Sequence, residues 1–181
     1  PHPPIAVAGI SPGSETLEIA GERGWIPMSI NLIPPRYLNS HWESVERGAN
    51  RVNRTPDRSL WRIARDIYVA DTAEQAREEA LEGTLGRDYR EFFFSLLGNM
   101  GRLDLMKHDP DMPDSDVTVD YLIDNVFIVG SPDEVVDKLQ KVRDEVGGFG
   151  VLLTMGHEWD PREPWMHSVK LLKEEVVPRL S

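Results

Sequence analysis

The sequence predicts an α/β protein whose strands form a parallel sheet covered by helices. Two patterns along the 181 residues indicate this fold class. Short, continuous apolar runs, which are typical of strands buried on both faces, alternate with segments that carry apolar residues at helical spacing. Most of these segments also open with helix-cap residues. Strands that alternate with helices in this way form parallel sheets, because each helix returns the chain to the start of the next strand.

The predicted strands are the runs richest in Ile, Val and aromatic residues: 5–9, 25–30, 61–69, 126–129 and 151–155. Pro27 makes the second strand short or irregular, because proline donates no hydrogen bond to a neighbouring strand. Arg62, Arg65 and Asp66 interrupt the apolar pattern of the third strand. We interpret these charged residues as structural, with some of them paired.

The helices are predicted from their caps and their apolar spacing. Ser11-Pro12 is interpreted as the cap and first position of a helix that Gly24 ends. Thr72–Gln75 forms a capping box. Ser131-Pro132 and Asp160-Pro161 each place proline at the first helical position. Further helices are expected over 36–53 and 117–125.

Residues 98–116 interrupt this alternation. They combine Gly, Pro and Asp with scattered Met residues, and they show no helical or strand period. Loops of this length in compact domains are usually functional or mobile. We therefore expect a long, mobile loop here.

Composition excludes several classes of function. The formal net charge of -11 argues against nucleic acid and anionic membrane surfaces, because both bind clustered Lys and Arg. The chain has no cysteine, and its five histidines are dispersed without the spacing of a metal site. No apolar run reaches the roughly 18 residues of a spanning helix, and no signal peptide is visible. A cytoplasmic protein is the default expectation, and the missing initiator Met suggests a fragment.

The junction between the first strand and the first helix is the strongest candidate site. It reads Gly9-Ile10-Ser11-Pro12-Gly13-Ser14. Helix N-termini offer backbone N–H groups and a positive dipole end, and small residues allow a phosphate to approach them. Ser11 acting only as a helix cap explains the same residues. The junction matches neither a nucleotide P-loop nor a dinucleotide fingerprint.

His157 is a second candidate, because it directly follows the last predicted strand. Ligands of parallel α/β folds bind at the carboxyl ends of the strands, so its side chain is expected on the binding face. The alternative is a surface histidine in a turn before a helix. No Ser–His–Asp order or nucleophile elbow is visible, so no catalytic residue is assigned.

Four motifs, in this order, resemble the bacterial luciferase-like, flavin-dependent monooxygenases. They are Ile5–Ser11 with Ala20–Gly24 and Ile26–Ser29, then Asp66–Thr72 with Glu74-Gln75-Ala76, then Val129–Val135, and finally Glu175–Leu180. Together they extend over nearly the whole chain. The resemblance implies a TIM-type (β/α)8 barrel of which residues 1–181 hold the second half, about four strand–helix units, with 98–116 as a mobile lid.

The resemblance also implies a cofactor and partners. A flavin reductase would supply reduced FMN, which activates O2 for the oxygenation of a small hydrophobic substrate. The missing N-terminal half of the barrel would carry the catalytic residues, so the isolated fragment is expected to be inactive. A homo-oligomer is expected to cover the open sheet edges. The nearest alternatives are an F420-dependent oxidoreductase of the same fold and a non-catalytic flavin-binding or structural fragment.

Two groups of site residues follow from the resemblance. The cofactor-binding residues are Ala8, Gly9, Ile10, Ser11, Gly13 and Ser14. The substrate-binding residues are Met28, Ser29, Asn31 and, from its place after the last strand, His157. No metal is expected.

Overall fold

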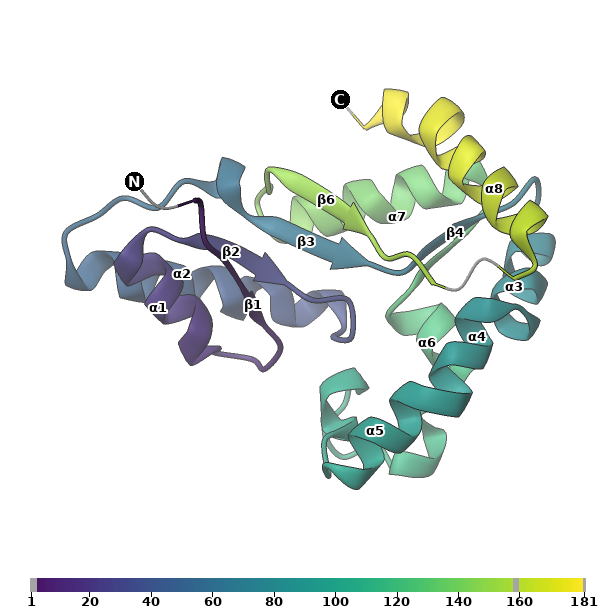
Figure 1. Cartoon of the computed structure of the whole chain (residues 1–181), viewed down its shortest axis with the longest axis horizontal. Helices are drawn as coiled ribbons and strands as arrows, with labels where there is room; N and C mark the ends of the chain where they lie inside the picture. The colour runs from purple at the N-terminus through teal and green to yellow at the C-terminus, as the bar shows by residue number, and fades with distance from the viewer. Residues whose placement is uncertain (1–2, 158–159, 181) are drawn as a thin grey trace. The chain divides into compact units, whose positions relative to one another are not determined.

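A computed structural model describes residues 3–157 and 160–180 (Figure 1). The chain divides into two compact units, each described by itself. Unit 1 comprises the chain up to Arg65 together with Arg143–Thr154, and unit 2 comprises Asp66–Val142 and the chain from Met155 onward.

Unit 1 is built on a parallel sheet with the strand order β1-β2-β3-β6. The strands are β1 (Ala6–Gly9), β2 (Ile26–Ser29), β3 (Arg62–Arg65) and β6 (Val151–Thr154). Gly9 lies opposite Ser29, and Arg65 lies opposite Thr154. The parallel arrangement predicted from the sequence is confirmed. The sheet is open among the described residues, with β1 and β6 at its edges.

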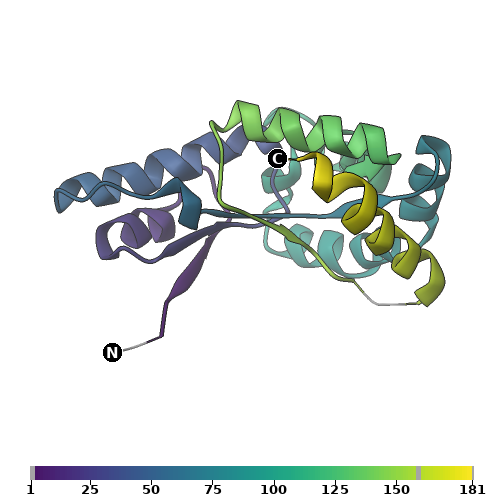
Figure 2. The same ribbon diagram turned by 90° about the horizontal axis from the view of Figure 1, so that it is seen from above.

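Two helices cover this sheet. Helices α1 (Glu15–Arg23) and α2 (Leu38–Arg51) pack against each other and against β2 (Figure 2). Their backbones approach closely where small residues meet: a Cβ added to Gly48 would lie 1.7 Å from the carbonyl oxygen of Glu18. Leu17, Leu38 and Trp42 fill the space beneath the helices and are buried. This packing holds α2 beside α1, and the loop that joins β1 to α1 enters at the N-terminal end of α1.

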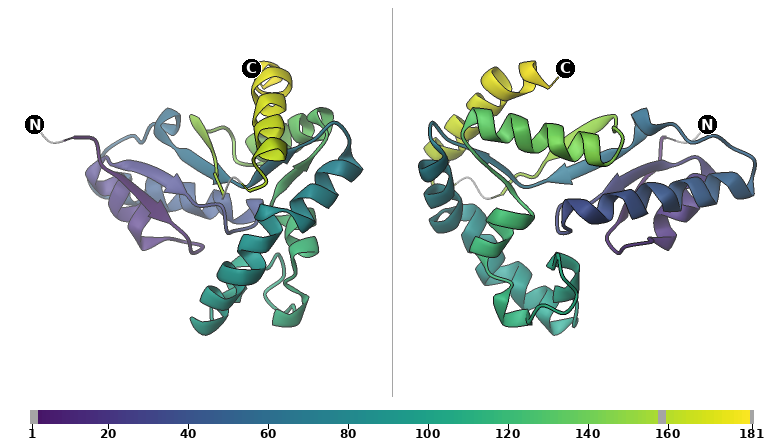
Figure 3. Two further views of the ribbon diagram at one scale, coloured as in Figure 1. Left: turned by 45° about the vertical axis from the view of Figure 1, so that its right-hand side comes forward. Right: turned by 180° about the vertical axis from the view of Figure 1, so that it is seen from behind.

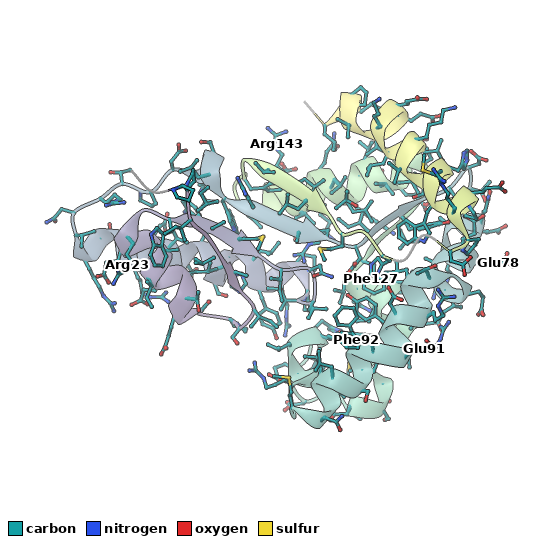
Figure 4. The ribbon with its side chains drawn as sticks, viewed as in Figure 1. Arg23, Glu78, Glu91, Phe92, Phe127 and Arg143 are labelled. Atoms are coloured by element: carbon teal, nitrogen blue, oxygen red, sulfur yellow. The ribbon has the colours of Figure 1, made fainter. Side chains whose placement is uncertain are left out.

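Unit 2 contains a second parallel pair, β4 (Ile67–Val69) and β5 (Ile128–Gly130). The surrounding helices are α3 (Ala73–Glu82), α4 (Thr84–Asp88), α5 (Phe94–Asn99), α6 (Val119–Asn125), α7 (Pro132–Glu145, whose end belongs to unit 1) and α8 (Arg162–Leu171). Helix α3 packs on both strands and α8 packs on β4 (Figure 3). The ring of Phe127, which is labelled in Figure 4, lies 4.7 Å from that of buried Tyr89.

Three element boundaries differ from the sequence prediction. The run 61–69 is not one strand, because Asp66 belongs to neither β3 nor β4 and its buried carboxylate bonds side chains of unit 2. Helix α1 begins three residues late, since Ser14 rather than Ser11 is its cap. Helix α8 begins at Arg162 with Pro161 as its cap residue, so Asp160 is not the cap.

The segment 98–116 has more local structure than its composition predicts. It contains two single 3-10 turns, Leu103–Met106 and Asp114–Asp116. Met106 is buried, and the ammonium of Lys107, also buried, lies 2.5 Å from a carboxylate oxygen of Asp114. Apolar and ionic anchors therefore hold part of the segment, and its mobility stays a prediction.

Candidate cofactor loop and its supports

The loop after β1 lines an open cavity of about 400 Å³, whose walls are Ala8 and Ile10 to Thr16. Gly9 has to be small, because an added Cβ would lie 2.5 Å from the Leu17 side chain. Gly13 has a φ of +65°, a left-handed conformation that glycine adopts without steric cost. The Ser14 hydroxyl accepts a hydrogen bond from the Leu17 N–H and so caps α1. The sequence thus builds a tight turn that ends at a helix N-terminus.

The donor groups that line this cavity are chemically compatible with the phosphate of a flavin mononucleotide. The first turn of α1 presents N–H groups that lack intrahelical partners, and a phosphate gains from these groups and from the helix dipole. The Ser14 hydroxyl uses a lone pair for the cap and keeps its proton for donation. The carboxylate of exposed Glu15 is the one lining charge, so the cation that balances a phosphate has to come from elsewhere.

Helix α2 holds the loop through two adjacent residues. The Gly13 N–H donates to the Ser40 hydroxyl at 3.2 Å, and the Ser40 hydroxyl donates to the Tyr37 carbonyl at 2.7 Å. The Nε2 atom of His41 lies 3.0 Å from the Ser11 carbonyl oxygen. The loop is therefore tied to α2 on both sides of Pro12.

His41, which bonds this loop, is fully buried, and its environment keeps the imidazole neutral. Its side chain is 0% exposed. Burial, together with the charge of Arg65, lowers the pKa of His41 to about 4, although the hydrogen bond to Ser11 opposes this shift. At neutral pH the imidazole therefore carries one proton.

The second predicted group lies at the end of β2. Ser29 is buried, and its hydroxyl bonds His41 Nδ1 at 2.8 Å and Trp61 Nε1 at 3.0 Å. Its hydroxyl is thus engaged by two side chains of unit 1, and its contact with a substrate stays a prediction. Met28 is half-buried and Asn31 is buried. Contact of Met28 and Asn31 with a substrate stays a prediction.

Arg65 supports the loop that follows β2. This buried guanidinium donates to the Ile33 carbonyl at 3.1 Å and approaches the Ile30 carbonyl at 3.4 Å. The structural interpretation of Arg65 is therefore correct. Arg65 stabilises backbone carbonyls, and Asp66 bonds the side chains described next.

His157 lies between two carboxylates of unit 2. Its Nε2 is 2.8 Å from Asp66 and its Nδ1 is 2.8 Å from Asp88. The Tyr89 hydroxyl donates to the other oxygen of Asp66 at 2.7 Å, and the Trp165 ring lies 5.7 Å from the imidazole. Both ring nitrogens are thus engaged and the side chain is 5% exposed. The surface-histidine alternative is wrong, and contact of His157 with substrate stays a prediction.

Burial lowers the pKa of His157, but hydrogen bonds and charges from Asp66 and then Asp88 outweigh this effect and raise the pKa above its ordinary 6.5. The cluster of Asp66, Asp88, Tyr89 and His157 therefore favours the imidazolium. The ion pairs of this imidazolium with Asp66 and Asp88 stabilise unit 2.

A second large cavity, of about 440 Å³, lies in unit 2. Its lining includes Tyr68, Trp165 and the carboxylates of Glu78, Glu79 and Glu82. This lining repels a phosphate, so the loop of unit 1 remains the better cofactor candidate. Across residues 3–157 and 160–180, no three His, Asp or Glu side chains are grouped as metal ligands, and no helix is long and apolar enough to cross a membrane.

Sequence reasoning missed the roles of His41 and Ser40. A signal for His41 was present, because it is three residues after Leu38 and so shares the apolar face of its helix. A histidine on such a face has to find buried partners. No local pattern identifies those partners, since Ser11 and Ser29 are 30 and 12 residues away.

Comparison with known proteins relates this chain to the luciferase-like monooxygenases. The luciferase-like monooxygenase family matches residues 1–148. The 3,6-diketocamphane 1,6-monooxygenase of Pseudomonas putida is 34% identical over 179 residues, which are 98% of this chain and 47% of that protein.

Solved structures extend this similarity. The oxygenating constituent of 3,6-diketocamphane monooxygenase from P. putida, a type II Baeyer–Villiger monooxygenase in complex with FMN, has a TM-score of 0.88 at 33% identity. The match covers 99% of this chain and 49% of that one. An F420-dependent secondary alcohol dehydrogenase, at 17% identity and a TM-score of 0.59 over 100% and 50% of the two chains, shares the fold. The chain thus spans about half the length of these relatives. It belongs to the luciferase-like monooxygenase family.

Proposed function

We propose that this chain is the flavin-phosphate-binding part of an FMN-dependent, O2-using monooxygenase. The observation that carries the proposal is the loop after β1, where a left-handed glycine and a capped helix N-terminus line an open cavity. We further propose that the chain forms the second half of a TIM-type barrel. The open edges at β1 and β6 would then pair with strands outside this chain.

Within this proposal each residue of the loop has a distinct task. Gly9 and Gly13 let the backbone make the turn, and Ala8 and Ile10 form its walls. Ser14 caps α1 and donates its proton to the phosphate, while the carbonyl of Ser11 anchors the loop to His41. Reduced FMN, when bound, supplies the electrons that activate O2, and a flavin reductase is the partner expected to provide it.

The substrate is proposed to be a small hydrophobic molecule. Half-buried Met28 is the apolar side chain at the end of β2, and methionine packs adaptably against varied shapes. A relative at 33% identity is named as a type II Baeyer–Villiger monooxygenase for a diketocamphane, a compact ketone. FMN is favoured over F420, because the F420-dependent protein is similar in fold alone.

The proposal is tested by replacing Gly13 with valine and titrating the chain with FMN and with riboflavin, which lacks the phosphate. A β-branched residue is strained at φ +65° and displaces the turn, so we expect FMN affinity to fall by about 10- to 100-fold. Riboflavin affinity should change little. Isothermal titration calorimetry measures both affinities.

Gly148 provides the matched control. It has a φ of +90° with no atom within 4 Å of an added Cβ, and it lies in the turn before β6. The Gly148→Val variant carries comparable backbone strain away from the loop and should retain FMN affinity. Equal weakening of FMN and riboflavin by Gly13→Val would show that the loop acts through folding, and the assignment would then be wrong.

A further inference from the structure

The contacts of His41 form a chain of hydrogen bonds with one fixed direction. A carbonyl oxygen only accepts, so the proton of His41 is on Nε2, which donates to Ser11. Nδ1 is then an acceptor and takes the hydroxyl proton of Ser29. The indole N–H only donates, so Trp61 donates to Ser29.

This chain of bonds leads from Trp61, the residue before β3, through Ser29 of β2 and His41 of α2 to the cofactor loop. Trp61, Ser29 and His41 are all buried, at 0% exposure. Buried polar groups that are fully partnered have few alternative arrangements, because each lost bond leaves a desolvated atom. The bond from His41 therefore ties the Ser11 carbonyl to the core of unit 1.

The direction of the Ser11 carbonyl matters for an anion. A carbonyl oxygen carries partial negative charge, and an oxygen turned toward a phosphate would oppose its binding. The His41 Nε2–H holds this oxygen toward α2. The neighbouring Ser40 accepts the Gly13 N–H, so the amides left for a ligand are those of the first turn of α1.

We propose that His41 is a positioning residue for the flavin phosphate, acting through the Ser11 carbonyl, and that Ser29 and Trp61 fix its tautomer. The inference rests on the proposed function of the loop. His41 does not touch the phosphate. His41 holds the loop in its binding conformation before the ligand arrives. Binding then does not include the entropic cost of ordering the loop, so affinity is higher.

Two amide variants separate this role from simple core packing. In His41→Gln the side-chain amide reaches the position of Nε2 and can still donate to Ser11. In His41→Asn the amide reaches only the position of Nδ1, so the bond to Ser29 is kept and the bond to Ser11 is lost. Both variants place a polar amide in the same cavity. If His41 had only a structural role, His41→Asn would not lower FMN affinity more than His41→Gln does while leaving riboflavin affinity unchanged.

The experiment measures binding of FMN and riboflavin to the wild-type chain and both variants by flavin fluorescence, with thermal unfolding followed in parallel. We expect His41→Asn to weaken FMN by about tenfold and to leave riboflavin unchanged, whereas His41→Gln stays within about threefold of the wild type. Imidazole 15N NMR of the wild-type chain should show the Nε2–H tautomer at neutral pH.

Each other result overturns a defined part of the account. A wild-type chain that binds FMN and riboflavin equally overturns the proposed function and this inference with it. A wild-type preference for FMN that persists in His41→Asn, or that both variants lose equally, overturns this inference alone. An Nδ1–H tautomer in the wild-type spectrum also overturns it, even if neither variant folds.

Discussion

Replacing His157 by leucine is expected to destabilise unit 2 by about 3–5 kcal/mol, which is the usual cost of removing one partner from a buried ion pair. The Asp66 side chain is 0% exposed and would lose its cationic neighbour. The hydroxyl of Tyr89 would remain as one hydrogen-bond donor to this carboxylate, but it is uncharged and would not replace the imidazolium. Asp88 is 24% exposed, so water can compensate this second carboxylate.

His167 provides the control for this substitution. It pairs with Asp71 at 3.1 Å, but the two side chains are 43% and 63% exposed. Exposed ion pairs contribute little, so His167→Leu should cost less than about 1 kcal/mol. Urea unfolding of the two variants gives the comparison. If His157→Leu costs no more than His167→Leu, the cluster around Asp66 does not support unit 2 in the way described.

The same cluster predicts how stability changes with pH. The pKa of His157 is raised in the folded chain, so this group binds its proton more tightly folded than unfolded. Its contribution is complete below the unfolded pKa near 6.5 and is lost as pH rises through the folded pKa. Wild-type stability should therefore fall over that interval relative to the His157→Leu variant.

His41 has the opposite dependence, and its effect is the second largest expected. Its folded pKa of about 4 is below its unfolded pKa near 6.5. As pH falls through this interval, the unfolded chain takes up a proton that the folded chain does not, so stability falls. At about pH 4.5 the loss relative to neutral pH should be about 2–3 kcal/mol.

The His41→Gln variant isolates this effect, because glutamine does not titrate while all carboxylates remain. Urea unfolding of the wild type and the variant at neutral pH and at about pH 4.5 gives the difference attributable to His41. The wild type should lose more stability than the variant. Equal losses would mean that protonated His41 is accommodated in the fold, and the buried chain of bonds from Trp61 would then be incorrectly described.

The sequence was sufficient for the parallel sheet and for the order of most strands and helices, because burial on both faces and helix caps are local signals. Local signals failed where a distant partner decides the outcome. Ser11-Pro12 matches a helix start, but the cap is Ser14, and the Ser11 carbonyl accepts a hydrogen bond from His41, which lies 30 residues away. Asp66 interrupts a strand for the same kind of reason, since His157 is 91 residues away.

The candidate site divides in a similar way. Gly9 and Gly13 indicated a tight turn from their type and position alone, and the backbone at Gly13 is left-handed. The approach of a ligand to this turn stays a prediction. Ser29 was selected for its place at the end of a strand, but no sequence pattern shows whether a side chain there faces a pocket or a histidine. The roles of Ser40 and His41 depend on tertiary hydrogen bonds and were found only in the structure.

The central claim is that the loop after β1 receives the flavin phosphate. The most direct test is 15N-labelled amide mapping of the whole chain during titration with FMN and, separately, with riboflavin. We expect FMN to shift the amide resonances of Ser14, Glu15 and Thr16 at the start of α1 and riboflavin to leave them unchanged. Equal shifts with both ligands, or FMN shifts confined to residues outside the loop, would contradict it.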